Sequence, residues 1–113
     1  MSTGILGSAE AFALTDLISV PAGGIASRVL AKNSGGNVTV FAFDGGEGLS
    51  EHTSPFDALV IVIDGALTLT VAGTPIRARA GSITRLPAGV PHAVEATERS
   101  RMLLIMFRDA HGG

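Results

Sequence analysis

Turn-forming residues divide most of this sequence into short runs of apolar and β-branched residues. The turns recur about every 8 to 12 residues, the spacing typical of a sandwich or barrel built from short strands. No sustained helical period, repeat or low-complexity segment competes with this pattern, so the sequence predicts an all-β fold. We expect strands over residues 25–31, 38–43, 59–63, 67–71, 76–80, 81–86, 92–95 and 102–107.

The periodicity within these runs indicates which strand faces should be buried. Leu67, Leu69 and Val71 alternate with threonines, the pattern of a strand with one face toward the core. Residues 38–43 and 102–107 are apolar on both faces, so we expect both faces of these strands to be covered. A small barrel does not need this much apolar surface for its own core, and the excess predicts a homodimer.

The remaining residues flank the predicted strands. We expect a barrel over residues 25–107, preceded by a tail and a helical turn in residues 1–24 and followed by a tail in residues 108–113. Apolar residues between positions 10 and 18 indicate a short helix, with Thr15 as its N-cap.

Composition excludes several classes of function. The chain has 113 residues, of which 46% are apolar and 16% charged, so it should form one ordered domain. Its net charge of −2 and its lack of a Lys/Arg cluster argue against a nucleic-acid partner. No run approaches the roughly 20 apolar residues of a membrane-spanning helix. The chain has no cysteine and no pattern of a signal peptide, and we expect a cytoplasmic protein.

Two of the three histidines, His52 and His92, lie in segments that are rich in glycine and proline. Folding must bring these distant segments together if the histidines are to act as one site. Each histidine also has a purely structural interpretation. His52 is compatible with a half-exposed strand position, and His92 with a hydrogen bond to a backbone carbonyl after its proline turn.

Together the two segments resemble the paired motifs of the cupins, small jelly-roll barrels with a double-stranded β-helix. The first motif is matched by Gly46, His52 and Gly65, whereas Ser54 stands in place of a second histidine and Ala58 in place of a glutamate.

The second motif is matched by Gly81, Pro87, Gly89 and His92, and Ala96 stands in place of an asparagine. The resemblance covers roughly residues 25–107. Within the superfamily, residues 51–60 are similar to a subgroup of stand-alone bacterial cupins, most of which are functionally uncharacterised. The resemblance therefore implies a fold and a dimer, but no particular reaction.

The resemblance also implies a divalent metal, held inside the barrel by the histidines and the glutamate of these motifs. Two of the four ligand positions are lost in this chain, so His52 and His92 remain as candidate ligands for Mn, Fe, Ni or Zn. By strand parity Glu51, Asp57 and Glu95 should face away from this site. What remains is a pair of imidazoles completed by water or ligand, or a polar pocket without a metal.

Three functions are compatible with these residues. The first is binding of a small molecule by His52, Ser54 and His92, with at most a weak metal site formed by the two histidines. The second is a metal-dependent dioxygenase, isomerase or decarboxylase acting on a small acid or polyol, as the resemblance to cupins implies. The third is a structural dimer without ligand. The sequence leaves open whether the protein is an enzyme.

The sequence also predicts that Arg85, just before the second turn, lies on the protein surface.

Overall fold

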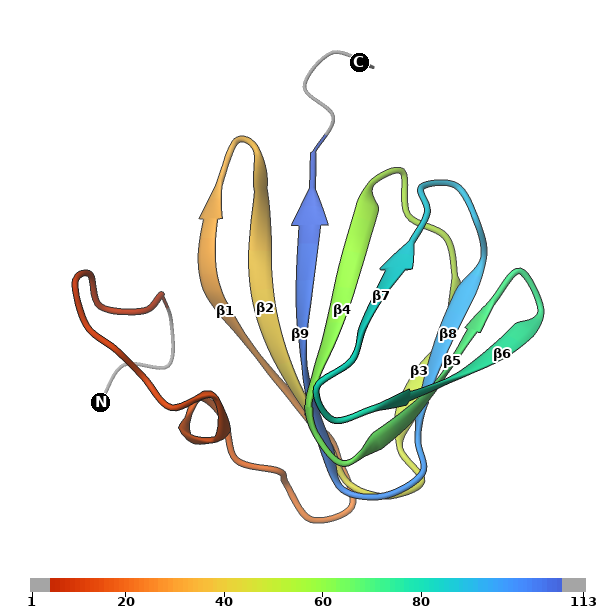
Figure 1. Ribbon diagram of the computed structural model, residues 1–113, viewed down its shortest axis with the longest axis horizontal. Coiled ribbons are helices and arrows are strands. Elements are labelled where there is room, and N and C mark those ends of the chain that lie inside the picture. Colours follow the sequence, from red (N-terminus) through yellow and green to blue (C-terminus); the bar gives the residue numbers. More distant parts are fainter. Residues whose placement is uncertain (1–4, 109–113) are drawn as a thin grey trace.

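The computed structural model describes residues 5–108, which form two antiparallel β-sheets and one short 3-10 turn (Figure 1). The larger sheet has the strand order β1-β2-β9-β4-β7, and the smaller sheet has the order β3-β8-β5-β6. This arrangement confirms the predicted all-β jelly roll. The elements are η1 (Leu14–Asp16), β1 (Ile25–Asn33), β2 (Gly36–Phe43), β3 (Gly48–His52), β4 (Asp57–Asp64), β5 (Ala66–Val71), β6 (Thr74–Arg79), β7 (Ile83–Leu86), β8 (His92–Ala96) and β9 (Ser100–Phe107).

The main core lies between the two sheets. It follows from the period of two in each strand, because alternate side chains share one face. On β5, for example, Leu67 and Leu69 are fully buried, as the sequence predicts from their alternation with threonines. The other buried members of this core are Phe43, Ala58, Val60, Val62, Ala78, Leu86, Val94, Ala96 and Met102.

A second, smaller core lies on the outer face of the larger sheet. The segment that precedes β1, which we call the N-terminal arm (residues 5–24), packs Leu17 there against Leu30 and Val40. The arm is tied to β1 by the backbone N–H of Leu6, which donates to the carbonyl of Leu30 at 2.8 Å. This cover explains why Val40 on the outer face of β2 is buried, as Phe43 is on its inner face; both faces are covered along the second half of the strand, as predicted from its sequence.

The predicted helix between positions 10 and 18 is much shorter in the structure. Only Leu14–Asp16 forms a helical turn, and Thr15 lies inside that turn instead of capping it. The N-cap position is Ala13, which offers no side-chain hydrogen bond. Ala13 is in an extended conformation, and the segment instead crosses the sheet so that both Leu6 and Leu17 pack on its outer face. Within the described residues, no helix is long and apolar enough to cross a membrane. The predicted tails fall partly on residues 1–4 and 109–113, outside the part of the chain that the structure describes.

The last strand departs from the prediction in a different way. Its inner residue Met102 is buried, but on its outer face Leu103 and Ile105 are only partly buried and Phe107 is 47% exposed. The expectation that both faces of residues 102–107 are covered is therefore wrong within a single chain. The N-terminal arm reaches Leu103 but leaves the rest of this face open.

Gly65, in the tight connection between β4 and β5, is required by close packing as well as by backbone conformation. Its φ is +78°, and a Cβ at this position would collide with the carbonyl of Arg99 and the hydroxyl of Ser100. That hydroxyl is itself buried and accepts a hydrogen bond from the N–H of Ala66 at 3.0 Å. The contact thus joins the start of β5 to the start of β9.

We predict that Gly65→Ala lowers the free energy of unfolding by about 3 kcal/mol, the sum of backbone strain and overpacking. Gly73, in the turn between β5 and β6, is a matched control because its φ is +80° and nothing lies within 4 Å of its Cβ position. Gly73→Ala should cost only about 1 kcal/mol, the backbone term alone. Urea unfolding of both variants measures the difference, and equal losses would show that the contact with Arg99 and Ser100 is unimportant.

Candidate functional site

The candidate site is built on the pairing of β3 with β8. His52 and His92 are direct cross-strand partners in this antiparallel pair. Leu49 pairs with Val94 further along, and the register shifts between these two pairs. The shift places one extra residue in β3, as in a β-bulge. Without it Glu51 would stand opposite His92, so the bulge is what brings an imidazole to this position.

The two imidazole rings touch. Their centroids are 4.4 Å apart and their planes meet at 71°, an edge-to-face arrangement. His92 is 7% exposed and lies on the inner face of β8 with Val94, whereas His52 is exposed. The pair therefore lies at the boundary of the barrel, with His92 on the interior side and His52 on the solvent side.

Each ring is oriented by its own backbone. Nδ1 of His52 lies 2.8 Å from the carbonyl oxygen of Ser50, and Nδ1 of His92 lies 3.1 Å from that of Val90. A carbonyl oxygen only accepts hydrogen bonds, so Nδ1 must carry the proton in both rings. In the neutral rings Nε2 then has a free lone pair. The predicted hydrogen bond between His92 and a backbone carbonyl is therefore present, and it involves Nδ1. It does not use Nε2, which could bind a ligand.

Two hydrogen bonds between distant loops hold the histidine segments together. The backbone N–H of Gly89 donates to the carbonyl of Ser54 at 2.8 Å, and the N–H of Ala88 donates to Oδ1 of Asp57 at 2.8 Å. We call this pair of contacts the loop clamp. It fastens the turn before β8 to the loop after β3, at the end of the sheets where His52 and His92 lie.

Ser54 serves the backbone in this arrangement. Its hydroxyl oxygen accepts a hydrogen bond from the N–H of Phe56 at 3.2 Å, which shapes the loop before β4. The residue is partly buried. Its predicted role in ligand binding stays a prediction, because the described contacts involve only the protein itself.

Two of the acidic residues near the site face away from the histidines, as predicted from strand parity. Glu95 is exposed on the face of β8 opposite to His92, and Asp57 pairs with Phe107 on the outer face of the larger sheet. Glu51 is exposed beside the bulge, where strand parity does not hold, and its orientation stays a prediction. Arg85 is also on the surface, as predicted, and its Nη2 lies 3.2 Å from the Asp57 carboxylate.

Hydrogen bonding lowers the pKa of Asp57. The Ala88 N–H, and next the Arg85 guanidinium, hold the pKa of the Asp57 carboxyl below its usual value of 3.8. These donors stabilise the ionised form, so the loop clamp works best when Asp57 carries its charge.

The matches to known proteins support the same architecture. The family model of the cupin domain matches residues 39–107, which include β3, β8 and the loop clamp. The chain belongs to the cupin family. No curated protein matches it.

Solved structures similar to this cupin include three bacterial proteins. A conserved protein of unknown function from Streptococcus pyogenes is 30% identical, with a TM-score of 0.88 over 94% of this chain and 93% of that one. A cupin 2 conserved barrel domain protein from Leptotrichia buccalis is 39% identical, with a TM-score of 0.82 over 86% of this chain but only 47% of that one. A cupin superfamily protein from Desulfitobacterium hafniense is 26% identical, with a TM-score of 0.86 over 92% and 95%. None of these three proteins is named for a reaction.

The residues of this cupin do not fit the four-ligand metal site that its motifs imply. Ala58 is buried on the inner face of β4, in the main core, and has no donor atom. Among residues 5–108, no group of three or more His, Asp or Glu side chains could hold a metal ion. Any metal at this position would have to bind the two imidazoles alone and complete its coordination with water or another molecule.

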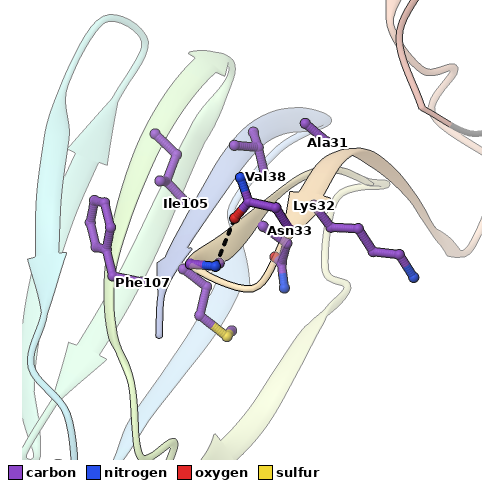
Figure 2. A pocket seen from close by; sticks show the side chains of 10 residues that line it. Ala31, Lys32, Asn33, Val38, Ile105 and Phe107 are labelled. Carbon is purple, nitrogen blue, oxygen red and sulfur yellow. Dashed lines mark hydrogen bonds between the residues drawn. The ribbon is translucent and has the colours of Figure 1, made fainter. Parts of the chain in front are cut away.

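Two hollows lie away from the histidines, on the outer face of the larger sheet. One, of about 200 Å³, is lined by Val38, Ile105 and Phe107 and by the turn between β1 and β2 (Figure 2). The other, of about 320 Å³, lies under the N-terminal arm and includes Leu17 and Leu103 in its wall. The strand pattern predicts neither hollow, because the first depends on the turn between β1 and β2 and the second on where the arm crosses the sheet.

The lowered pKa of Asp57 predicts a defined pH dependence of stability. A carboxyl whose pKa is lower in the folded state contributes stability above its unfolded pKa of about 3.9, and this is lost as the pH falls through the folded pKa. We expect wild type to be more stable than Asp57→Asn at pH 7 and the difference to shrink toward zero near pH 2. Urea unfolding across this range measures it.

Arg85→Ala serves as the control for this experiment. It removes the second cause of the shift but leaves the Ala88 N–H in place, so it should keep most of the pH dependence. A difference between wild type and Asp57→Asn that stays constant with pH would contradict the role of the loop clamp.

Proposed function

We propose that this cupin binds a small polar molecule at the His52–His92 pair, with at most a weak divalent metal site there. The observation that carries the proposal is the orientation of the two rings. Both Nδ1 atoms are engaged by backbone carbonyls, and the two rings lie in contact at the solvent end of the barrel. Two fixed Nε2 lone pairs at one place are suited to a ligand that can share them.

The chemistry of the pair favours a ligand with hydroxyl or amine donors. Neutral Nε2 accepts a hydrogen bond, so a polyol or a hydroxy acid could donate to both rings. The surroundings of the pair are apolar. Val71 is the cross-strand partner of His92 and packs on the main core, as does Leu49, whose partner Val94 lies two residues beyond His92 on β8. Few polar groups on an apolar wall are typical of sites for small molecules.

A metal ion is the alternative ligand of the same two atoms. Two imidazoles leave most of the coordination shell to water, so the affinity should be low and should follow the general order in which Ni²⁺ and Zn²⁺ exceed Mn²⁺ and Fe²⁺. The enzyme hypothesis depends on this site, since a metal-dependent reaction would need His52 and His92 as ligands.

The test uses nuclear magnetic resonance of the histidine ring nitrogens. We expect the Nε2 signals of His52 and His92 to move on titration with Zn²⁺ or Ni²⁺, or with members of a panel of polyols and small hydroxy acids. His111, which lies outside the described residues, is the internal control and should not move with them. If no compound or metal shifts either ring, the proposed site is wrong.

Mutation of the pair gives a quantitative prediction. His52→Ala or His92→Ala should weaken metal binding by about 10-fold or more, since even the loss of a residue behind a ligand costs about 10- to 100-fold. Calorimetric titration with Zn²⁺ measures the affinity, and His111→Ala is the matched control. An affinity reduced only by His111→Ala would place the metal elsewhere in the chain.

A further inference from the structure

The inner face of the larger sheet carries polar side chains near the open end of the barrel. On β2, Asn37 and Thr39 share a face with the core residue Phe43, because alternate residues of a strand point the same way. Lys32 of β1 is the cross-strand partner of Asn37 and therefore lies on the same face. Figure 2 shows its side chain directed away from Val38, which is on the outer face. The register shift in the middle of β1 turns this lysine inward.

The two sheets face each other in a fixed order of strands. At the end of the barrel away from the histidines, short connections join β2 to β3, β8 to β9, β4 to β5 and β6 to β7 (Figure 1). The order β2-β9-β4-β7 in the larger sheet therefore matches the order β3-β8-β5-β6 in the smaller sheet. The inner face of β2 thus lies across the barrel from β3, the strand that carries His52.

The distance from these connections along each strand gives the level of its side chains. His52 is the last residue of β3, five residues long, and Thr39 is at the corresponding level of β2 when residues are counted back from Phe43. Asn37 lies two residues nearer the open end, about 7 Å further along the strand. A ligand that contacts the histidines and extends toward solvent therefore passes Asn37 and its partner Lys32.

Asn37 and Lys32 offer hydrogen-bond donors, whereas the histidines offer acceptors. The hydroxyl of Thr39 donates to Oδ1 of Asn37 at 3.4 Å, which leaves the amide group Nδ2 to donate to a ligand. Lys32 is exposed and takes part in neither of the two ion pairs described within residues 5–108. Its ammonium group can only donate hydrogen bonds, and it carries a positive charge.

The other charges at this end of the barrel also favour an anion. Asp57 lies outside the barrel and is paired with Arg85. Arg108, whose guanidinium lies 5.7 Å from the centre of the Phe56 ring, adds a second positive charge beside the loop before β4. Among the described residues of β3, Glu51 is the single acidic one. An anionic ligand would therefore meet a neutral or positive surface over most of this end.

We propose that Lys32 and Asn37 bind the carboxylate of a ligand whose hydroxyl group is bound by His52 and His92, so that the ligand is a small hydroxy acid. The inference rests on the proposed function and specifies its class of ligand. The Nε2 atoms accept a hydrogen bond from the hydroxyl, and the ammonium and amide groups donate to the carboxylate. Facing sheets pack about 10 Å apart, so one small molecule can contact both.

The first test compares matched ligands by calorimetric titration. Gluconate differs from sorbitol by a carboxylate in place of one hydroxymethyl group, and lactate differs from lactamide by its charge. We expect the acid of each pair to bind about 5-fold or more tightly than its uncharged partner. The difference should shrink in about 0.5 M NaCl, because salt screens the charge. Equal affinities within both pairs, or no binding of any of the four compounds, would overturn the inference.

The second test uses variants. Lys32→Gln should weaken gluconate binding by about 5-fold and leave sorbitol binding unchanged, and Lys32→Arg should restore most of the preference for the acid. Arg77→Gln is the matched control, because Arg77 is exposed on β6 opposite Thr68, on the outer face of the smaller sheet, and it should change neither affinity. A preference for the acid that survives Lys32→Gln would overturn this inference alone. Binding that is unaffected by His52→Ala would overturn the proposed function as well.

The third test observes Lys32 directly, because it is the only lysine of the chain. Reductive methylation with ¹³C-formaldehyde gives one lysine signal in nuclear magnetic resonance spectra, and its absence from Lys32→Arg identifies it. Gluconate should shift this signal and sorbitol should not. Asn37→Asp should abolish the gluconate shift, since it places a carboxylate against that of the ligand. A lysine signal that gluconate does not move, or one that moves equally in Asn37→Asp, would contradict the proposed contacts.

Discussion

The loop clamp is the contact on which the geometry of the candidate site depends. The two histidines are far apart in sequence, and the strands that carry them form the pair β3–β8, in which β3 is an edge strand with a single neighbour. An edge strand is held by one ladder of backbone hydrogen bonds and frays more easily than a central one. The bonds from Ala88 and Gly89 to Asp57 and Ser54 add two fixed points beside this ladder. These two bonds hold the segment that follows His52 against the turn that precedes His92.

The same clamp explains why a motif can persist while its metal ligands are absent. Pro87 and Gly89 shape a turn whose N–H groups point at the neighbouring loop, and the turn performs this structural task without any metal. Ser54 and Ala58 have no side-chain ligand to offer a metal in place of the motif's histidine and glutamate, yet the backbone of Ser54 and the carboxylate of Asp57 still complete the contact. The motif residues that remain are largely those that build the backbone, together with one histidine from each segment.

Much of the fold could be predicted from the sequence because period-two alternation and glycine turns are local signals. Leu67 to Val71 shows its buried face directly, and Gly65 marks a turn that packing leaves no room to change. β3 was not recognised as a separate strand, since residues 48–52 have neither alternation nor β-branched side chains. Its register shift depends on hydrogen bonds with β8, which no local pattern encodes. The meeting of His52 and His92 was therefore predicted from a motif, and its geometry could be obtained only from the structure.

Strands that are apolar on both faces gave the same signal with different outcomes. Val40 on β2 is buried by the N-terminal arm, whereas Phe107 on β9 stays exposed in the single chain. Apolar residues on a strand face predict that the face is buried, but they do not identify the segment that packs on it. The arm itself was hard to predict, because only a 3-10 turn punctuates it and its place is fixed by contacts with Leu30 and Val40. The predicted homodimer accordingly remains a prediction.

The bulge in β3 makes strand register a chemical variable. Because the extra residue decides whether His52 or Glu51 stands opposite His92, a slip of β3 by one residue would exchange an imidazole for a carboxylate without any change of sequence. Register is usually regarded as a matter of which strand face is buried. At this edge of the barrel it also sets the donor atoms that a ligand would meet, so one sequence in two registers could differ in what it binds.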